Sequence, residues 1–159
     1  MNARPAYSVF GERHTILLTG EETGGDYAVI EAIVLPGGGP PYHVHDAQDE
    51  AFVVMRGTFE FALAGRTVRV PPGGTLSIPR GVPHTFTVVG EEPGAVVVTV
   101  SPAGLERYFA EIGTPLTTRD EAPPPFSPEQ VERAVGLMPR YGMALVPPPP
   151  PAAGPAAAA

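Results

Sequence analysis

Three histidines and one glutamate have the residue types and the spacing needed to bind a metal ion. His43 and His45 are separated by one residue, Glu50 follows them, and His84 lies further along the chain in the segment PRGVPH. Alternate residues of a β-strand project from the same face, so His43 and His45 can direct both imidazoles toward one point. Three imidazoles and a carboxylate form a complete donor set for one divalent transition metal. The sequence therefore predicts a metal centre at these four residues.

The predicted donors suit Fe, Mn, Ni, Co, Cu or Zn and do not select among these metals. Four protein ligands would leave part of the coordination sphere open to water, O₂ or a chelating substrate. A structural zinc site is normally closed and often rich in thiolates, and this chain has no cysteine. A metal-free cluster of core histidines is the alternative, and the grouping of three histidines with a glutamate favours the metal.

Glu50 has two predicted roles. It can remain bound as an anionic ligand, or it can act as a catalytic residue that takes a proton from the substrate. The second role is open because an apolar barrel raises the pKa of a carboxyl group while a nearby cation lowers it. Asp46 and Asp49 are expected either to be solvated or to orient the histidines. His14 is expected to be an ordinary surface or core residue.

Short apolar segments bounded by glycine and proline must position these side chains. The chain has 19 glycines and 22 prolines, and most of them separate runs rich in Val, Ile, Phe and Thr. This pattern predicts an all-β fold of the sandwich, jelly-roll or barrel type. The expected strands are Thr15–Thr19, Tyr27–Leu35, Tyr42–His45, Glu50–Arg56, Thr58–Leu63, Thr67–Val70, Leu76–Ile78, Thr85–Val89 and Ala95–Val100.

Two short helices are expected after the strands. In the first, Leu105 begins an apolar stripe with helical spacing that ends at Ile112. In the second, Ser127 and Gln130 form a capping-box pattern around Pro128. We expect a barrel domain over residues 1–113, an extension with a short helix over 114–146, and a disordered tail of Pro, Ala and Gly over 147–159.

Length, charge and hydropathy limit the class of protein. A length of 159 residues is typical of one domain. The net charge of −7 and the lack of a basic patch argue against binding to nucleic acid. No apolar run is long enough to span a membrane. The first residues contain no apolar signal segment, so a cytoplasmic location is expected.

The spacing of the candidate ligands resembles the two signature motifs of the cupin superfamily. The first motif runs from Gly37 through the candidate ligands to Gly57, and the second runs from Gly73 through Pro79 and Gly81 to His84. The wider run resembles single-domain cupins of the quercetin 2,3-dioxygenase type. The resemblance implies a small jelly-roll β-barrel with His43, His45, Glu50 and His84 around an internal metal. It also implies a homodimer, for which the segment Tyr7–Thr19 is a candidate to cover an edge strand of the partner.

An apolar chamber around the metal is predicted from strand alternation. The second motif usually closes with Asn four residues after its histidine, and this chain has Val88 there, which is expected to face inward near the metal. Ordinary core packing is the alternative for each member of the chamber. The candidate substrate-contacting residues are Tyr42, Phe52, Val54, Phe59, Phe61, Phe86 and Val88.

A metal with an open position in an apolar chamber favours a small-molecule site. The leading hypothesis is an oxygenase that acts on a small aromatic or enolic molecule, with O₂ as a second substrate. One alternative is an isomerase, decarboxylase or cyclase that uses the metal as a Lewis acid. Another is a non-catalytic cupin that binds a metal or a small molecule.

Overall fold

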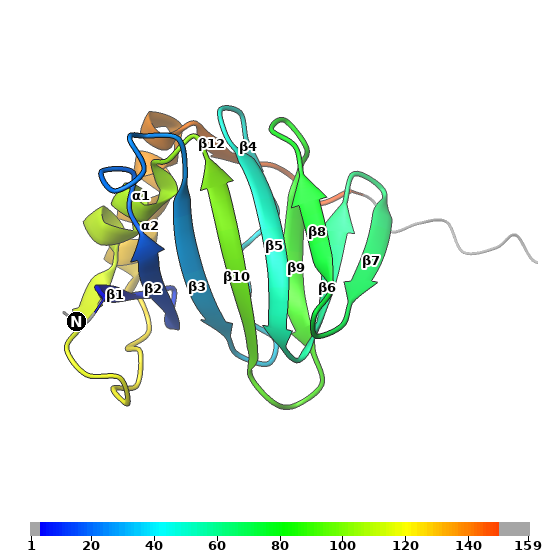
Figure 1. Cartoon of the computed structure of the whole chain (residues 1–159), viewed down its shortest axis with the longest axis horizontal. Coiled ribbons are helices and arrows are strands. Elements are labelled where there is room, and N and C mark those ends of the chain that lie inside the picture. The colour runs from blue at the N-terminus through cyan, green and yellow to red at the C-terminus, as the bar shows by residue number, and fades with distance from the viewer. Residues whose placement is uncertain (1–3, 150–159) are drawn as a thin grey trace, which may run out of the picture.

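Two antiparallel β-sheets face each other in the computed structural model, which describes residues 4–149 (Figure 1). The larger sheet contains, in spatial order, β11 (Thr114–Leu116), β1 (Ala6–Val9), β2 (Glu12–Leu18), β3 (Ala28–Val34), β10 (Gly94–Ser101), β5 (Asp49–Arg56) and β8 (Thr75–Ile78). The smaller sheet contains β12 (Met143–Leu145), β4 (His43–His45), β9 (His84–Val89), β6 (Thr58–Leu63) and β7 (Arg66–Val70). This arrangement confirms the all-β, jelly-roll type of fold.

The nine strands expected from the sequence correspond to β2 through β10. Their observed ends differ from the expected ends by at most three residues, and Thr58–Leu63 agrees at both ends. β1, β11 and β12 were not among the expected strands. Each has only three or four residues, so tertiary pairing rather than local pattern decides that they form.

The core lies between the sheets and follows the period of two that strands impose. In β3, Ile30 and Val34 are buried while the residues between the buried ones are partly exposed. Aromatic rings from the two sheets meet in this layer, with the ring centroids of Phe52 and Phe61 5.1 Å apart. Burying each such side chain stabilises the fold by roughly 1.5–3 kcal/mol. The packed layer therefore fixes the distance between the sheets that carry the candidate ligands.

Both expected helices are present as α1 (Leu105–Ile112) and α2 (Pro128–Leu137), and a 3₁₀ helix, η1 (Met138–Tyr141), follows α2. The capping box of α2 forms as predicted, with Ser127 accepting from the Gln130 backbone. The helices lie together beside β1 and β2 (Figure 1). Tyr108 of α1 donates a hydrogen bond of 2.9 Å to the carbonyl of Ala134 in α2.

The extension predicted for residues 114–146 adds a strand to each sheet. β11 pairs with β1, and β12 pairs with β4. β1 also pairs with β2, so the segment predicted to cover a partner's edge has both of its own edges filled within the chain. Residues 147–149 of the predicted tail are exposed and belong to no helix or strand, and the rest of that tail lies outside the described residues.

Candidate metal centre

The four candidate ligands meet inside the fold. His43 and His45 come from β4 and His84 from the neighbouring strand β9, whereas Glu50 comes from β5 in the other sheet. All four side chains are buried, and one donor atom from each lies within 4.8 Å of the others. Each sheet therefore contributes to one compact group of three imidazoles and a carboxylate.

The donor atoms approach one another closely. His84 Nε2 lies 2.9 Å from Glu50 Oε2, and His45 Nε2 lies 3.6 Å from Glu50 Oε1. His43 Nε2 lies 3.1 Å from His45 Nε2. In all three histidines it is therefore Nε2 that faces the centre of the cluster.

The opposite ring nitrogen of each histidine has an acceptor. His43 Nδ1 lies 2.8 Å from the carbonyl oxygen of Pro41, and His84 Nδ1 lies 3.0 Å from that of Val82. A carbonyl oxygen can only accept, so Nδ1 carries the proton in both rings and the inward Nε2 of a neutral ring has a free lone pair. His45 Nδ1 likewise lies 3.3 Å from the amide oxygen of Gln48. The Nε2 lone pairs of His43 and His45, 3.1 Å apart, therefore repel each other, unless a cation lies between them.

Two buried polar atoms of the cluster lack a hydrogen-bond partner, namely Glu50 Oε2 and His84 Nε2. They are 2.9 Å apart, yet their orientation does not make a hydrogen bond. Buried polar atoms in native proteins are normally satisfied, and a missing partner calls for an explanation such as an ion. The unpaired atoms and the inward lone pairs fit a divalent transition metal, for which imidazole nitrogen and carboxylate oxygen are common ligands.

The charge states of the cluster also suit metal binding. Burial, reinforced by the neighbouring histidines His84 and His45, lowers the pKa of His43 to about 4 and keeps that ring neutral. Burial alone would raise the pKa of Glu50, but contact with the imidazoles outweighs it and the pKa is lowered, so the side chain is a carboxylate. For His84, burial would lower the pKa, but contact with Glu50 outweighs it and the pKa is raised. A metal ion would compete with that proton.

Gln48 is a functional candidate that the sequence reasoning missed. It is buried, its Oε1 lies 3.3 Å from His45 Nδ1, and its Nε2 donates to the carbonyl of Pro102 at 3.2 Å. The amide therefore accepts the Nδ1 proton of His45 and fixes the ring with Nε2 inward. Nothing in the local sequence separates this glutamine from a solvated loop residue.

Asp46 and Asp49, the acidic residues next to the ligands in the sequence, lie toward the surface. Asp46 is exposed. Asp49 pairs with Arg80 at 2.8 Å on the surface, and the hydrogen bonds from Arg80 lower the pKa of Asp49 to about 2. Gly81, next to Arg80, donates its backbone N–H to the carbonyl of His45 at 2.8 Å. The segment that leads to His84 is thus tied to the strand that carries His45.

His14 is not part of the cluster. Its Nδ1 lies 3.3 Å from the backbone oxygen of Glu12, and its ring packs 4.7 Å from that of Phe109. Burial lowers the pKa of His14 to about 4. It is a neutral, packed histidine, as expected.

The predicted chamber residues lie mainly in the core. Phe52, Val54, Phe59, Phe61 and Val88 are buried, whereas Tyr42 and Phe86 are partly exposed. The ring of Phe86 packs 5.6 Å from that of Phe52 and 5.4 Å from that of Phe61. The role of these residues in substrate binding stays a prediction.

Val88 lies at the opposite end of β9 from His84. It pairs with Phe59, whereas His84 pairs with Leu63 at the other end of β6. Four residues of strand correspond to roughly 13 Å. The side chain of Val88 also faces Gly94, where an added Cβ would lie 2.8 Å from its methyl carbon. The position that departs from the family motif is thus a packing position in this fold.

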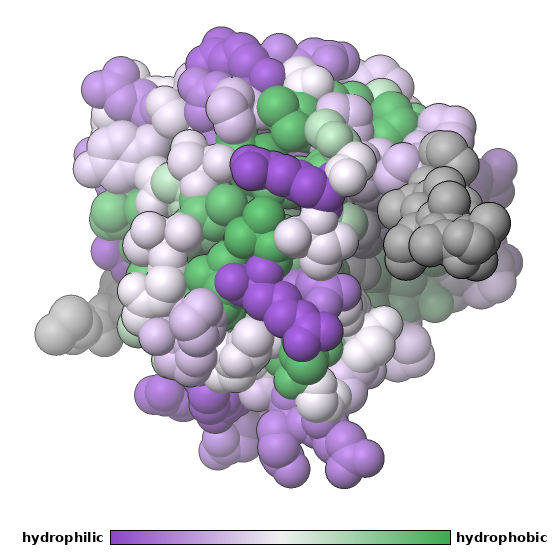
Figure 2. Space-filling model, turned by 90° about the vertical axis from the view of Figure 1, so that its right-hand side faces the viewer, coloured by the Kyte–Doolittle hydropathy of each residue, from purple (hydrophilic) through white to green (hydrophobic). Residues whose placement is uncertain are grey.

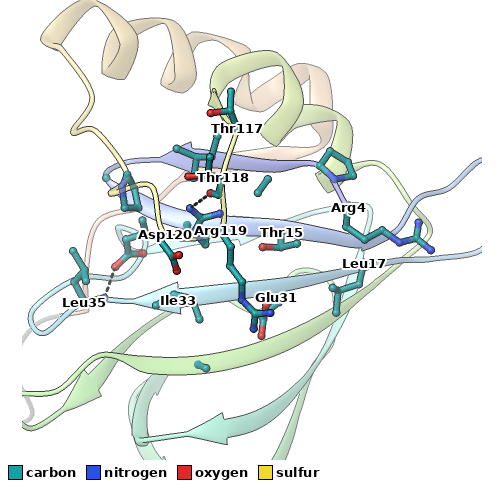
Figure 3. Close-up of a pocket in the computed structure, with 18 of the residues that line it drawn as sticks. Arg4, Thr15, Leu17, Glu31, Ile33, Leu35, Thr117, Thr118, Arg119 and Asp120 are labelled. Atoms are coloured by element: carbon teal, nitrogen blue, oxygen red, sulfur yellow. Dashed lines mark hydrogen bonds between the residues drawn. The ribbon is translucent and has the colours of Figure 1, made fainter. Parts of the chain in front are cut away.

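A hollow lies away from the cluster, on the outer face of the larger sheet. It has a volume of about 1000 Å³ and is bordered by Thr15, Glu31, Ile33 and the loop containing Arg119 (Figure 3). Along the same strands Ile16, Ile30 and Ala32 face the core. The sheet therefore separates this groove from the candidate ligands.

On the side of the molecule that carries β7, hydrophilic residues surround a central area with apolar residues (Figure 2). Arg56, Arg66 and Arg69 are all exposed. Arg69 forms an ion pair of 2.8 Å with Glu60.

Residues 30–100 match the family model of the cupin domain. The facing sheets and the histidine–glutamate cluster lie in and around this segment, and the chain therefore contains a cupin domain. Among characterised proteins, it is similar to quercetin 2,3-dioxygenase of Bacillus subtilis (strain 168), with 28% identity over 120 residues. This alignment covers 74% of the chain but 34% of the relative, so the chain spans about a third of that protein's length.

Two solved structures support the assignment of the fold. The structure of KdgF from Halomonas sp. matches with a TM-score of 0.55 and 23% identity, covering 61% of this chain and 85% of that one. An oxalate oxidase in complex with the substrate analogue glycolate matches with a TM-score of 0.51 and 27% identity, covering 58% of this chain and 52% of that one. Across residues 4–149, no helix has the length and apolar character to cross a bilayer.

Proposed function

We propose that this protein is a metal-dependent cupin oxygenase that acts on a small aromatic or enolic molecule. His43, His45, Glu50 and His84 would hold one divalent transition metal. The observation that carries the proposal is the convergence of three inward Nε2 atoms on the buried carboxylate of Glu50, whose Oε2 lacks a hydrogen-bond partner. Similarity to a quercetin 2,3-dioxygenase supports oxygenase chemistry over other reactions of the fold.

The bound metal would supply a Lewis-acidic centre with positions open to a chelating substrate and O₂. The protein contributes orientation, because backbone carbonyls and Gln48 fix the tautomers of the three rings. It also contributes a candidate proton acceptor. Glu50 is ionised at neutral pH because the imidazoles lower its pKa, so its carboxylate can accept the hydroxyl proton of an enol or phenol. The chamber of Phe52, Phe61 and Phe86 would exclude water from the reaction.

The metal itself is tested first, by elemental analysis of freshly purified protein and of His45→Ala. We expect about one equivalent of a transition metal in the native protein and a large loss in the variant. His14→Gln is the matched control, because His14 lies outside the cluster. An unchanged metal content in His45→Ala would contradict the ligand assignment.

The reaction is tested by O₂ uptake of the metal-loaded protein with flavonols, catechols and 1,3-diketones. Substrate-dependent O₂ consumption is expected, and Glu50→Gln is expected to abolish it. Turnover under strict anaerobiosis would instead support an isomerase, decarboxylase or cyclase. Tight ligand binding without turnover for any metal would support a non-catalytic binding protein. The homodimer and the cytoplasmic location stay predictions, and sedimentation analysis tests the first of them.

A further inference from the structure

The strand that carries two of the candidate ligands is held mainly by residues near the C-terminal end of the described chain. β4 has three residues and pairs with β9 at a single position, His43 with His84. Its other edge pairs along its whole length with β12, from Met143 to Leu145. Without β12, one edge of the ligand-bearing strand would have no partner in this sheet.

Two backbone hydrogen bonds bracket this pairing. Asp46 donates to the carbonyl of Gly142 at 2.7 Å, and Val146 donates to the carbonyl of Tyr42 at 3.1 Å. Hydrogen-bonded and non-hydrogen-bonded positions alternate along an antiparallel pair, and side chains are closest at the second kind. Counting inward from the two bonds makes Ala144 opposite Val44 a hydrogen-bonded position.

The same alternation puts both histidines at the close-contact positions. Met143 lies opposite His45, and Leu145 lies opposite His43. Paired residues of adjacent strands project from the same face of a sheet, so Met143 and Leu145 project on the side to which the imidazoles point. Met143 is buried, whereas Leu145 is 43% exposed. Met143 is therefore placed against the His45 ring, with Leu145 at the rim.

The helices fix the position of β12. Tyr141, immediately before the turn at Gly142, packs 5.3 Å from Tyr108 of α1 and donates a hydrogen bond to Glu111. Gly142 has a left-handed φ of 69°, and a Cβ there would lie 3.0 Å from that of Ala47 in the loop after His45. β12 thus enters the sheet from an anchored turn.

We propose that β12 is a positioning element of the metal centre and that Met143 is a positioning residue for the His45 imidazole. The inference rests on the metal site of the proposed function and adds a structural requirement to it. The extension holds the ligand strand in place, and its thioether side chain limits the rotation of a ligand ring.

Two truncations test the role of the strand. One ends at Gly142 and removes β12, and the control ends at Val146 and retains it. Apoprotein of each is titrated with Co²⁺, and binding is followed by visible absorption and by competition with a chelator. We expect the Gly142 truncation to lose affinity by about 10–100-fold, the range seen when the support of a ligand is removed. The Val146 truncation should bind Co²⁺ with the same affinity as the full chain.

Equal affinities in all three proteins would overturn the inference. Absence of Co²⁺ binding in the full chain itself would overturn the proposed function and the inference with it.

Point substitutions keep the test decisive if the shorter truncation does not fold. Met143→Ala is expected to weaken Co²⁺ binding several-fold, and Met143→Leu, which conserves volume, is expected to restore it. Met138→Ala is the matched control, because Met138 is also buried but lies in η1 rather than beside a histidine. Both alanine variants should lose stability, measured by urea unfolding of the apoprotein. If only stability falls and Co²⁺ affinity is unchanged in Met143→Ala, Met143 is ordinary core and has no positioning role.

Discussion

His84 Nε2 lies 2.9 Å from Glu50 Oε2, although the two residues belong to strands in opposite sheets. This contact is buried and links the sheets at a point where polar atoms replace the apolar layer. A cation held between these donors would connect the two sheets directly. Metal binding is therefore coupled to the stability of the whole fold.

Replacing Glu50 by Gln should uncouple metal binding from stability. The amide keeps the side-chain volume and removes the negative charge, so we expect metal affinity to fall at least about 10-fold. In the native protein, metal at 100 times its dissociation constant should raise the free energy of unfolding by about 2.7 kcal/mol. Urea unfolding with and without metal measures both effects. Glu91→Gln, on the surface, is the control and should respond to metal like the native protein.

Replacing Gln48 by Leu should weaken the metal site without a change of any ligand. The substitution removes the Oε1 that lies 3.3 Å from His45 Nδ1, so the ring loses the acceptor that fixes its tautomer and orientation. A loss of metal affinity of about 10–100-fold is expected, and Gln48→Glu, which retains an acceptor, should lose less. Isothermal titration with Co²⁺ or Zn²⁺ measures the affinity. An unchanged value for the leucine variant would mean that packing alone orients His45.

Val88→Asn should lower stability and leave metal binding unchanged. Val88 is buried near Phe59 and Gly94 at the far end of β9 from His84. An asparagine there would bury an amide without clear partners, at a cost of about 1–3 kcal/mol. Chemical denaturation measures the stability of the variant, and metal titration measures its metal affinity. A change in metal affinity with intact stability would show that this position reaches the metal after all.

Glu12 should make stability depend on pH near neutrality. Its side chain is buried and its Oε1 accepts a bond of 3.2 Å from the Leu35 backbone. Burial raises the pKa of Glu12 to about 7, so the folded protein binds this proton more tightly than the unfolded chain. The contribution is complete below about pH 4.5 and is lost as the pH rises through about 7.

Glu12→Gln should therefore gain stability relative to the native protein as the pH rises from 4.5 to 8, by about 3 kcal/mol. Urea unfolding of both proteins across this range measures the difference. The titration of His14 changes the stability of both proteins equally, so it does not affect the difference between them. Parallel stability profiles would show that Glu12 ionises in the folded state as readily as in the unfolded chain.

Elements and side-chain orientations that follow a local sequence pattern could be predicted from the sequence. Alternation of apolar residues placed Thr58–Leu63 as a strand with both ends correct. The spacing of His43 and His45 correctly put both side chains on one face. These features depend only on the period of a strand, which is visible within a few residues.

Features that depend on distant pairing were missed. β12 has the sequence Met-Ala-Leu, which favours no strand by itself, and it forms because β4 offers an open edge. The role of Gln48 depends on where the loop carries the amide relative to His45 and to Pro102. Such placement is set by the folded backbone, so residue type alone does not reveal it.

The pairing of His45 with Met143 also bears on the order in which the molecule is made. Ribosomes add about 5–20 residues per second, so the ligand strand emerges several seconds before the strand that flanks it. After residue 84 has been added, the nascent chain contains His43, His45, Glu50 and His84 but still lacks β12. If β12 positions the ligand strand as proposed, the complete metal site forms only once Met143–Leu145 have been made.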